Sequence, residues 1–345
     1  MRIYIIMLLF FCRNFINSLH LMKNKHQRRY LSLIPLNKDI TINQSYNIIK
    51  DKFSTENVSE PESSARYLIC DVAKIGYRMS DFNNNHNMIL NSIQLNQLNE
   101  FCFRRINREP VQYIIGNWDF YGSTFNCKSP VLIPRPETEE LVDHILNSKL
   151  LQSIKNRTIR ILDIGAGSGI IGITLLNELK NLDIECTAID ISSDAVSLAS
   201  TNAKQVLKNK SNRYNCILHS FQDYVDICFK DKMFIPFDMI ISNPPYIPSD
   251  EMEVLEPEVK DFEDHRALHG GNDGLDIIRD IIIQAPKLLR NDGQREIWME
   301  VSSSHIDMIE EWMNQPGPHS DSCVFVEKIR DLAGKNRFVR LKATV

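Results

Sequence analysis

From residue 159 to its end, the chain alternates short apolar segments with segments whose apolar residues recur at helical spacing. This alternation restricts the fold more than any other feature. Strands separated by helices form a mostly parallel sheet covered by helices on both faces. We expect strands at 159–164, 184–191, 216–219, 237–242, 296–301, 323–329 and 337–342, and helices at 169–180, 193–207, 276–289 and 304–312. The predicted class is α/β, and ligands of such sheets bind beyond the carboxyl ends of the strands.

The region before this alternation has a different pattern. Between residues 39 and 110, apolar residues recur at helical spacing, as in Ala65, Leu68, Ile69, Val72 and Ala73, and again in Leu95, Leu98, Phe101, Cys102 and Arg105. A proline with acids in the first turn is typical of a helix start, so the run 60–63 predicts one, with loops at Gly76 and 83–85. We therefore predict a small helical domain.

The segment 111–135 reads as a linking β-hairpin. The run 111–115, the dipeptide Gly116-Asn117 and the run 118–121 predict strand, turn and strand, and 125–133 predicts a further extended stretch. Thr138 is then the predicted N-cap of a helix that runs through Leu146. The predicted domains are a helical substrate-recognition domain at 39–110, a hairpin linker at 111–135 and a catalytic domain at 136–345.

Charge divides the chain at Asp39. Residues 1–38 contain seven basic residues and no acid, whereas the remainder carries 33 basic against 44 acidic residues, a net charge of −11. An acid-free, Arg/Lys-bearing leader without a small-residue cleavage site favours a mitochondrial transit peptide over a secretory signal. We expect a matrix protein, with a cytoplasmic location as the alternative.

Several function classes are excluded. No apolar run approaches the length of a membrane span, so we expect no membrane partner. The eight cysteines contain no CxxC pair, which indicates neither a metal site nor a disulfide framework.

The first predicted strand runs into a glycine loop, Asp163-Ile164-Gly165-Ala166-Gly167-Ser168-Gly169. Its spacing is neither the dinucleotide fingerprint G-x-G-x-x-G nor a Walker loop. Asp163 suits a positively charged ligand group, and Asp190, at the end of the next strand, suits the two hydroxyls of a ribose. The pattern looks like the S-adenosyl-L-methionine site of Rossmann-like methyltransferases. The predicted cofactor residues are Asp163, Gly165, Ala166, Gly167, Ser168, Gly169, Asp190 and Asn243.

The tetrad Asn243-Pro244-Pro245-Tyr246 follows the strand predicted at 237–242. Two prolines keep the backbone extended and remove two N–H donors. The Asn243 side-chain oxygen and the Pro244 carbonyl can then accept hydrogen bonds, and Tyr246 offers a stacking face. These features match a planar group that carries NH2. As its nitrogen attacks a methyl sulfonium, positive charge develops, and fixed acceptors stabilise that charge in the transition state. We predict Asn243, Pro244 and Tyr246 as catalytic, and all four as substrate-binding.

Such a pocket fits an adenine amino group or a glutamine or asparagine amide. The acidic body argues against a nucleic-acid substrate, which would favour Lys and Arg. An adenine-N6 methyltransferase of RNA or DNA is the alternative, and a non-catalytic assembly protein of the same fold is the second.

The sequence resembles the protein-(glutamine-N5) methyltransferases of HemK/PrmC type, which modify class 1 peptide-chain release factors. The resemblance spans residues 108–341 and is carried by the runs 109–116, 132–139, 163–169, 242–247, 267–275 and 331–339. It implies that the helical domain and hairpin help to hold the release factor, and that the glutamine of a Gly-Gly-Gln motif enters at 243–246. We expect a monomer that binds no nucleic acid directly.

Two points remain open. Arg135 and Glu137 are either functional loop anchors or a structural ion pair. The family has an acid followed by an aromatic residue near the adenine, whereas this chain reads Ser220-Phe221-Gln222-Asp223. Phe221 could stack on adenine, and the position of the hydrogen-bonding acid is undecided.

Overall fold

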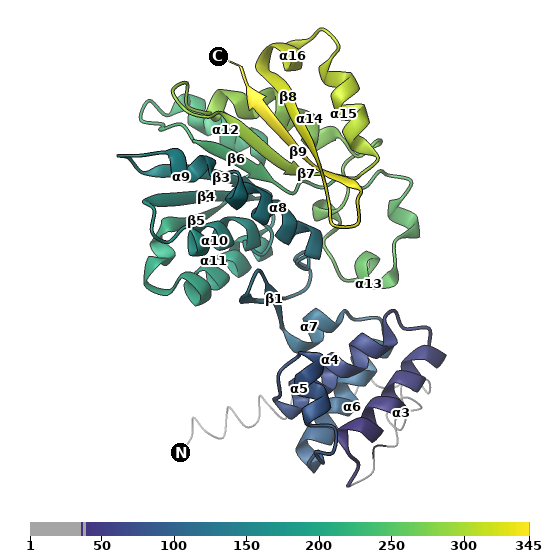
Figure 1. Ribbon diagram of the computed structural model, residues 1–345. Coiled ribbons are helices and arrows are strands. Elements are labelled where there is room, and N and C mark those ends of the chain that lie inside the picture. The colour runs from purple at the N-terminus through teal and green to yellow at the C-terminus, as the bar shows by residue number, and fades with distance from the viewer. Residues whose placement is uncertain (1–35, 37–38, 345) are drawn as a thin grey trace, which may run out of the picture. The chain divides into compact units, whose positions relative to one another are not determined.

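The computed structural model describes Leu36 and residues 39–344, which form two compact units that meet between Ile115 and Gly116 (Figure 1). The predicted transit peptide, 1–38, lies outside the described residues apart from Leu36. No helix in the described part of the chain combines the length and apolarity needed to cross a membrane. The two units are considered separately below.

The first unit is helical, as predicted, but the loop predicted at 83–85 is wrong for Asn83 and Asn84, which are helical. Its helices are α3 (Ile42–Thr55), α4 (Pro61–Ala73), α5 (Met79–Asn84), α6 (Ser92–Ile106) and α7 (Val111–Ile115). The five residues that define the predicted stripe of α6 are its buried residues. One of them is Arg105, whose guanidinium donates to the Ser64 hydroxyl at 3.1 Å and to the Ser59 carbonyl at 2.9 Å. These bonds tie α6 to the start of α4 and satisfy a charge that would otherwise be costly to bury.

The strand predicted at 111–115 is wrong, because this segment is the helix α7. The N–H groups of Tyr113 and Ile114 both donate to the Pro110 carbonyl, which closes a helical turn. Val111, Tyr113 and Ile114 are all buried, so the alternation of faces that a strand requires is missing. Gly116, at φ +79°, then ends the helix.

The hairpin begins later than predicted and belongs to the second unit. It consists of β1 (Asn117–Phe120) and β2 (Ser123–Asn126), which pair antiparallel. Tyr121 and Gly122 form the turn, and both have positive φ, as type I′ hairpin turns require. The extended stretch predicted at 125–133 ends as a strand at Asn126.

The core of the second unit is a seven-stranded sheet in the order β5-β4-β3-β6-β7-β9-β8. The strands are β3 (Ile159–Ile164), β4 (Ile184–Asp190), β5 (Tyr214–Leu218), β6 (Met239–Ser242), β7 (Glu296–Glu300), β8 (Cys323–Arg330) and β9 (Asn336–Ala343). The first five are parallel, and β8 and β9 run antiparallel at one edge. The mostly parallel sheet predicted from the sequence is confirmed.

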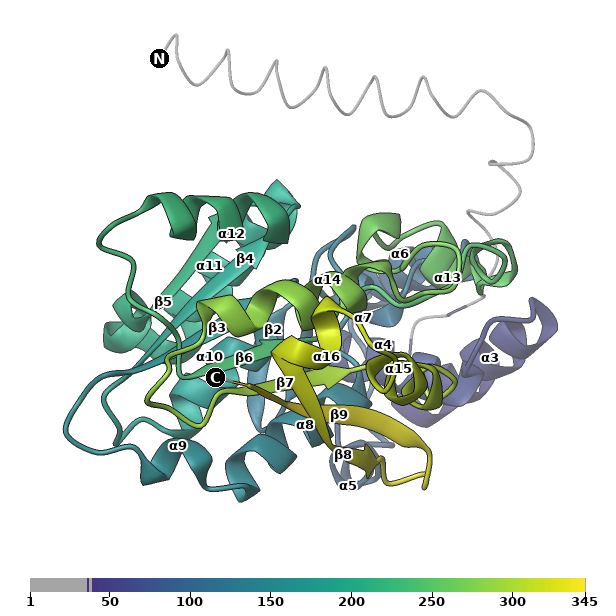
Figure 2. The ribbon, with the colours of Figure 1, turned by 90° about the horizontal axis from the view of Figure 1, so that it is seen from above.

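Helices cover both faces of this sheet (Figures 1 and 2). On one face α8 (Pro136–Asn147), α10 (Ile170–Glu178) and α11 (Ser193–Leu207) pack over an apolar cluster. On the other, α12 (Phe221–Lys230), α14 (Asp276–Gln284) and α15 (His305–Met313) pack over a second cluster. Side chains alternate along β3, so that Ile161 joins the first cluster and Leu162 the second.

The remaining elements are short. They are α9 (Leu150–Ser153), α13 (Pro257–Lys260), α16 (Pro318–Ser322) and the 3-10 turns η1 (Lys208–Arg213), η2 (Met252–Val254), η3 (His265–Ala267) and η4 (Ala285–Leu288).

Two predicted helix boundaries are wrong, each because of a proline. The helix predicted from a Thr138 N-cap begins at Pro136, with Arg135 as N-cap and Thr138 inside its first turn. Proline is well accommodated at the first position because that N–H has no partner within a helix. The helix predicted to reach Leu289 ends at Gln284, because Pro286 cannot continue the hydrogen-bond ladder.

Candidate active site

The glycine loop and the Asn-Pro-Pro-Tyr tetrad lie side by side because β3 and β6 are neighbours. Ile164, the last residue of β3, pairs with Ser242, the last residue of β6. The buried Ser242 hydroxyl donates to the Ile164 carbonyl at 2.8 Å. The sheet order also reverses direction at β3, and such switch points are where α/β sheets bind their ligands.

The glycine loop is shaped by backbone conformations that favour glycine. Gly167 has φ +56°, and a Cβ atom there would meet no atom within 4 Å. Gly169 has φ +83°, and a Cβ atom there would lie 2.9 Å from the Tyr214 hydroxyl and 3.1 Å from the Ala199 Cβ. The loop therefore leaves open space at Gly167, where its backbone can contact a ligand, and it packs closely against the protein at Gly169.

The two other residues of the loop are buried. Ala166 donates its N–H to the Ile189 carbonyl at 3.0 Å. The Ser168 carbonyl accepts from the Asn202 side chain at 2.9 Å. The buried Ser168 hydroxyl has no hydrogen-bond partner within the described residues, so a polar group of a bound ligand could satisfy it.

Asp190 closes the loop from the neighbouring strand. Its two carboxylate oxygens accept from the Gly167 N–H at 2.9 Å and from the Ser192 N–H at 2.8 Å. Burial raises the pKa of Asp190, and these two hydrogen bonds oppose that shift. A carboxylate offers about four acceptor positions, so capacity remains for two hydroxyl donors, which fits a ribose.

Asp163 is completely buried and faces α10, not the solvent. Its carboxyl accepts from the Gly172 N–H at 3.1 Å, while its other oxygen has no partner within the described residues. Burial raises the pKa of Asp163 to about 7. The carboxyl therefore supports the first turn of α10 beneath the glycine loop.

The tetrad is held from two sides. The half-buried Asn243 donates from Nδ2 to the Thr138 hydroxyl of α8 at 3.3 Å. On the other side the Ile247 N–H donates to the Leu268 carbonyl at 2.8 Å, and Gly270 packs so closely that a Cβ there would lie 2.8 Å from the Pro245 oxygen. Pro244 is buried, and burial raises the pKa of Tyr246 to about 12, so its phenol stays neutral.

Glu300 is a site residue that the sequence reasoning missed. The Thr138 hydroxyl donates to a Glu300 carboxylate oxygen at 2.7 Å, and both side chains are buried. Burial raises the pKa of Glu300 to about 7, although the Thr138 hydrogen bond and Arg337 lower it. The sequence contained a signal for Glu300, because it is an acid at the carboxyl end of a predicted parallel strand, as Asp190 is.

Arg135 forms an ion pair with the buried Glu263, to whose two oxygens it donates at 2.7 and 2.8 Å. Nearby, the Ser129 hydroxyl donates to the Phe262 carbonyl at 2.7 Å. The segment before α8 is therefore clamped to the segment that follows the tetrad, which supports the structural ion-pair alternative for Arg135. Glu137 is not its ion-pair partner; its charge contributes to raising the pKa of Glu300 and of Tyr246.

The run 220–223, where the sequence departs from the family pattern, forms the start of α12. Ser220 caps α12 by accepting from the Asp223 N–H at 3.1 Å and by donating to the Asp223 carboxylate at 2.7 Å. Phe221 is 9% exposed and belongs to the apolar cluster beneath α12. Asp223 is thus engaged in the helix cap.

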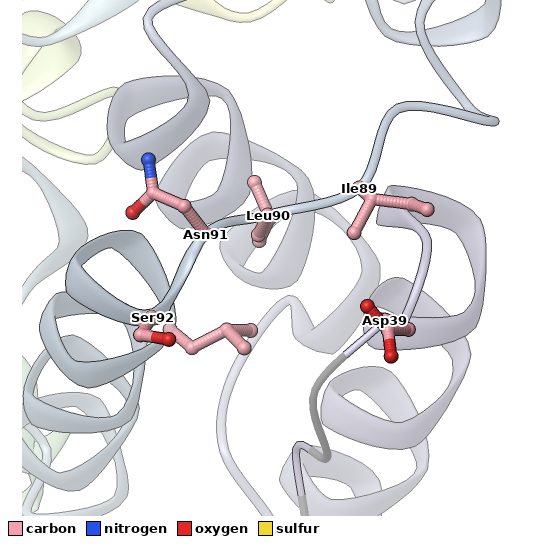
Figure 3. Close-up of a pocket in the computed structure, with 6 residues that line it drawn as sticks. Asp39, Ile89, Leu90, Asn91 and Ser92 are labelled. Atoms are coloured by element: carbon pink, nitrogen blue, oxygen red, sulfur yellow. The ribbon is translucent and has the colours of Figure 1, made fainter.

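The first unit contains a separate hollow of about 310 Å³, lined by Asp39, Ile89, Leu90, Asn91, Ser92 and Leu95 (Figure 3). None of the predicted site residues lines it. Its Asn91 side chain already accepts from the N–H groups of Ile93 and Gln94 at 3.0 Å each. The polar side chains of the candidate site lie instead at the ends of β3, β4, β6 and β7. Among the residues described, no cluster of metal-ligating side chains occurs.

Known proteins match both units. A family model described as the PrmC N-terminal domain matches residues 46–116, and one described as the methyltransferase small domain matches residues 143–256. The chain is 33% identical over 294 residues to the MTRF1L release factor glutamine methyltransferase of Homo sapiens, covering 84% of each chain.

The chain is also 32% identical over 287 residues to the release factor glutamine methyltransferase of Bacillus cereus, covering 83% of this chain and 94% of that one. Among solved structures, one described as a human methyltransferase 10 domain containing protein aligns with a TM-score of 0.45 and 15% identity, over 64% of this chain and 89% of that one.

Proposed function

The chain belongs to the release factor glutamine methyltransferase family, and on that premise we propose that it methylates the side-chain amide nitrogen of the glutamine in the Gly-Gly-Gln motif of a class 1 peptide-chain release factor. The enzyme is a methyltransferase that uses S-adenosyl-L-methionine. The observation that supports the proposal best is the position of Asn243, next to the glycine loop and with its amide already oriented.

The cofactor residues are those of the glycine loop and of β4. Gly165 to Gly169 provide a close backbone approach, and Asp190 has acceptor capacity left for the ribose hydroxyls. We assign Asp163 an indirect role, because its buried carboxyl holds the start of α10 below the loop. S-adenosyl-L-methionine, when bound, supplies an electrophilic methyl group on a sulfonium sulfur.

The substrate residues are those of the tetrad. Because Asn243 points its Nδ2 at Thr138, its oxygen is available to accept an N–H of the substrate amide. The Pro244 carbonyl is the second acceptor, and Pro245 and Tyr246 complete the pocket. As the amide nitrogen loses its conjugation during attack, its N–H groups become more acidic and bind these acceptors more strongly. Positioning supplies much of the remaining rate enhancement.

We also propose that the enzyme acts as a monomer in the mitochondrial matrix and does not bind nucleic acid directly. The location is supported by the seven basic residues and the absence of acids in residues 1–38. The net charge of −11 over the remaining residues supports a protein substrate, since phosphate contacts favour basic surfaces.

The test is transfer of a labelled methyl group from the cofactor to a purified mitochondrial release factor. We expect label on the wild-type factor and none on a factor whose Gly-Gly-Gln glutamine is replaced by asparagine. Structured RNA and duplex DNA are assayed in parallel. Label on adenine, with none on the release factor, would replace the proposal with the nucleic-acid alternative.

A further inference from the structure

A chain of three side chains joins Asn243, directly after β6, to α8 and β7 behind the proposed substrate pocket. Asn243 donates to the Thr138 hydroxyl at 3.3 Å, and the Thr138 hydroxyl donates to the Glu300 carboxylate at 2.7 Å. Thr138 is 1% exposed and Glu300 is also 1% exposed. Water therefore has little access to compete for these hydrogen bonds.

The direction of every bond in this chain follows from its charged end. An ionised carboxylate can only accept, and a threonine hydroxyl has a single hydrogen to donate. Once that hydrogen is given to Glu300, Thr138 can only accept from Asn243. The Asn243 amide must then turn its NH2 toward Thr138 and its oxygen away from it.

We propose that Thr138 and Glu300 are positioning residues that set the orientation of the Asn243 amide, so that its oxygen and not its NH2 group faces the substrate amide. This inference rests on the proposed function for its consequence in catalysis. The opposite orientation would present a donor where the transition state needs an acceptor.

The protonation state of Glu300 controls this arrangement. A protonated Glu300 can donate to Thr138, whose hydrogen is then free to bind the Asn243 oxygen and reverse the amide. Burial, opposed by the Thr138 hydrogen bond, Arg337 and Arg135 and assisted by Glu137, raises the pKa of Glu300 to about 7. Tyr246, which also lies near Glu300, stays neutral in this range because burial raises its pKa to about 12. Amide reversal is therefore expected below about pH 7.

The first experiment follows the Asn243 side-chain NH2 signals by ¹⁵N NMR on the full chain without substrate, with the Asn243→Asp variant to assign them. In wild type, we expect the signals to shift with a midpoint near pH 7, as Glu300 titrates. The shift should disappear in Glu300→Gln and Thr138→Val, and persist in the control Glu139→Gln on the same turn of α8. Signals that ignore pH in wild type, or titrate unchanged in Glu300→Gln, would overturn the inference whether or not the enzyme methylates a release factor.

The second experiment measures kcat, KM and cofactor affinity with the release factor. Thr138→Val, which removes the hydroxyl but keeps the shape, should lower kcat at least tenfold with little change in cofactor affinity. Thr138→Ser, which keeps the hydroxyl, should retain most of the wild-type kcat. Glu300→Gln should lose the dependence of kcat on pH between 6 and 8. Equal activity in Thr138→Val and Thr138→Ser would contradict the inference. Absence of turnover in wild type, with the NMR shift present, would contradict only the proposed function.

Discussion

The Asp190 carboxylate, at the end of β4, accepts a hydrogen bond of 2.9 Å from the Gly167 N–H in the loop that follows β3. This side chain therefore holds the loop in place, and it is also the residue that we propose for binding the ribose of the cofactor. The same carboxylate also accepts from the Ser192 N–H, which joins the end of β4 to the start of α11. The shape of the loop and the proposed contact with the ribose therefore depend on the same carboxylate.

Asp190→Asn should weaken cofactor binding at least tenfold, because an amide offers fewer acceptor positions and carries no charge for hydroxyl donors. Titration calorimetry with S-adenosyl-L-methionine measures the effect. Asp194→Asn, an exposed acid in the first turn of α11, is the matched control. Equal loss of affinity in both variants would show that the effect comes from net charge and not from the Asp190 contacts.

Asn243→Ala should reduce kcat by a factor of about 10² to 10³, the range found when one preorganised transition-state hydrogen bond is removed. Cofactor affinity should weaken only modestly, because the glycine loop and Asp190 are unchanged. Steady-state kinetics and cofactor titration separate the two effects. Asn272→Ala, at an exposed asparagine in the same unit, should behave as wild type. A kcat for Asn243→Ala within about tenfold of the wild-type value would exclude the acceptor mechanism.

Arg135→Ala should lower the free energy of unfolding by about 2–3 kcal/mol, because Glu263 is then left buried without its partner. The Arg135 side chain is 31% exposed, which places the effect below that of a fully buried pair. Urea denaturation gives the value. The double variant Arg135→Leu, Glu263→Leu should recover part of the loss, and a double variant less stable than the single one would argue against the clamp.

Stability should depend on pH through Asp163, whose pKa is raised by burial to about 7. In the unfolded chain this carboxyl titrates near ~4, so between these values the folded state holds the extra proton. Stability from this group is present at low pH and is lost as pH rises toward 7. The stability of Asp163→Asn relative to wild type should therefore increase as pH rises from 5 to 7, by on the order of 2 kcal/mol. The difference reached at pH 7 should persist at pH 8. Denaturation curves at several pH values test this, and a gain that is constant with pH would refute it.

Much of the fold could be predicted because local patterns and tertiary packing agree. The stripe of α6 and the range of β3 follow directly from apolar periodicity. The strand prediction for 111–115 failed because three buried apolar residues in a five-residue segment fit a strand or a short helix equally well. The segment is helical, with two N–H groups bound to the Pro110 carbonyl. In such a short segment, apolar pattern alone does not distinguish a strand from a helical turn.

The site was predictable where its residues form continuous motifs or, like Asp190, end a predicted parallel strand. The glycine loop and the tetrad are continuous motifs, and the order of strands β3 and β6 brings them together. Thr138 and Glu300 are 162 positions apart, and no pattern in either segment signals their hydrogen bond. Thr138 was therefore predicted as a helix cap. Asp163 was predicted as a direct cofactor residue, because no sequence pattern indicates its hydrogen bond to the Gly172 N–H.

The most direct test of the account is tandem mass spectrometry of a mitochondrial release factor after incubation with this enzyme and S-adenosyl-L-methionine. We predict a single added methyl group on the glutamine of the Gly-Gly-Gln peptide, formed by the wild type and formed far more slowly by Asn243→Ala at the same enzyme concentration. Methylation at any other residue, or equal methylation by both proteins, would contradict the account.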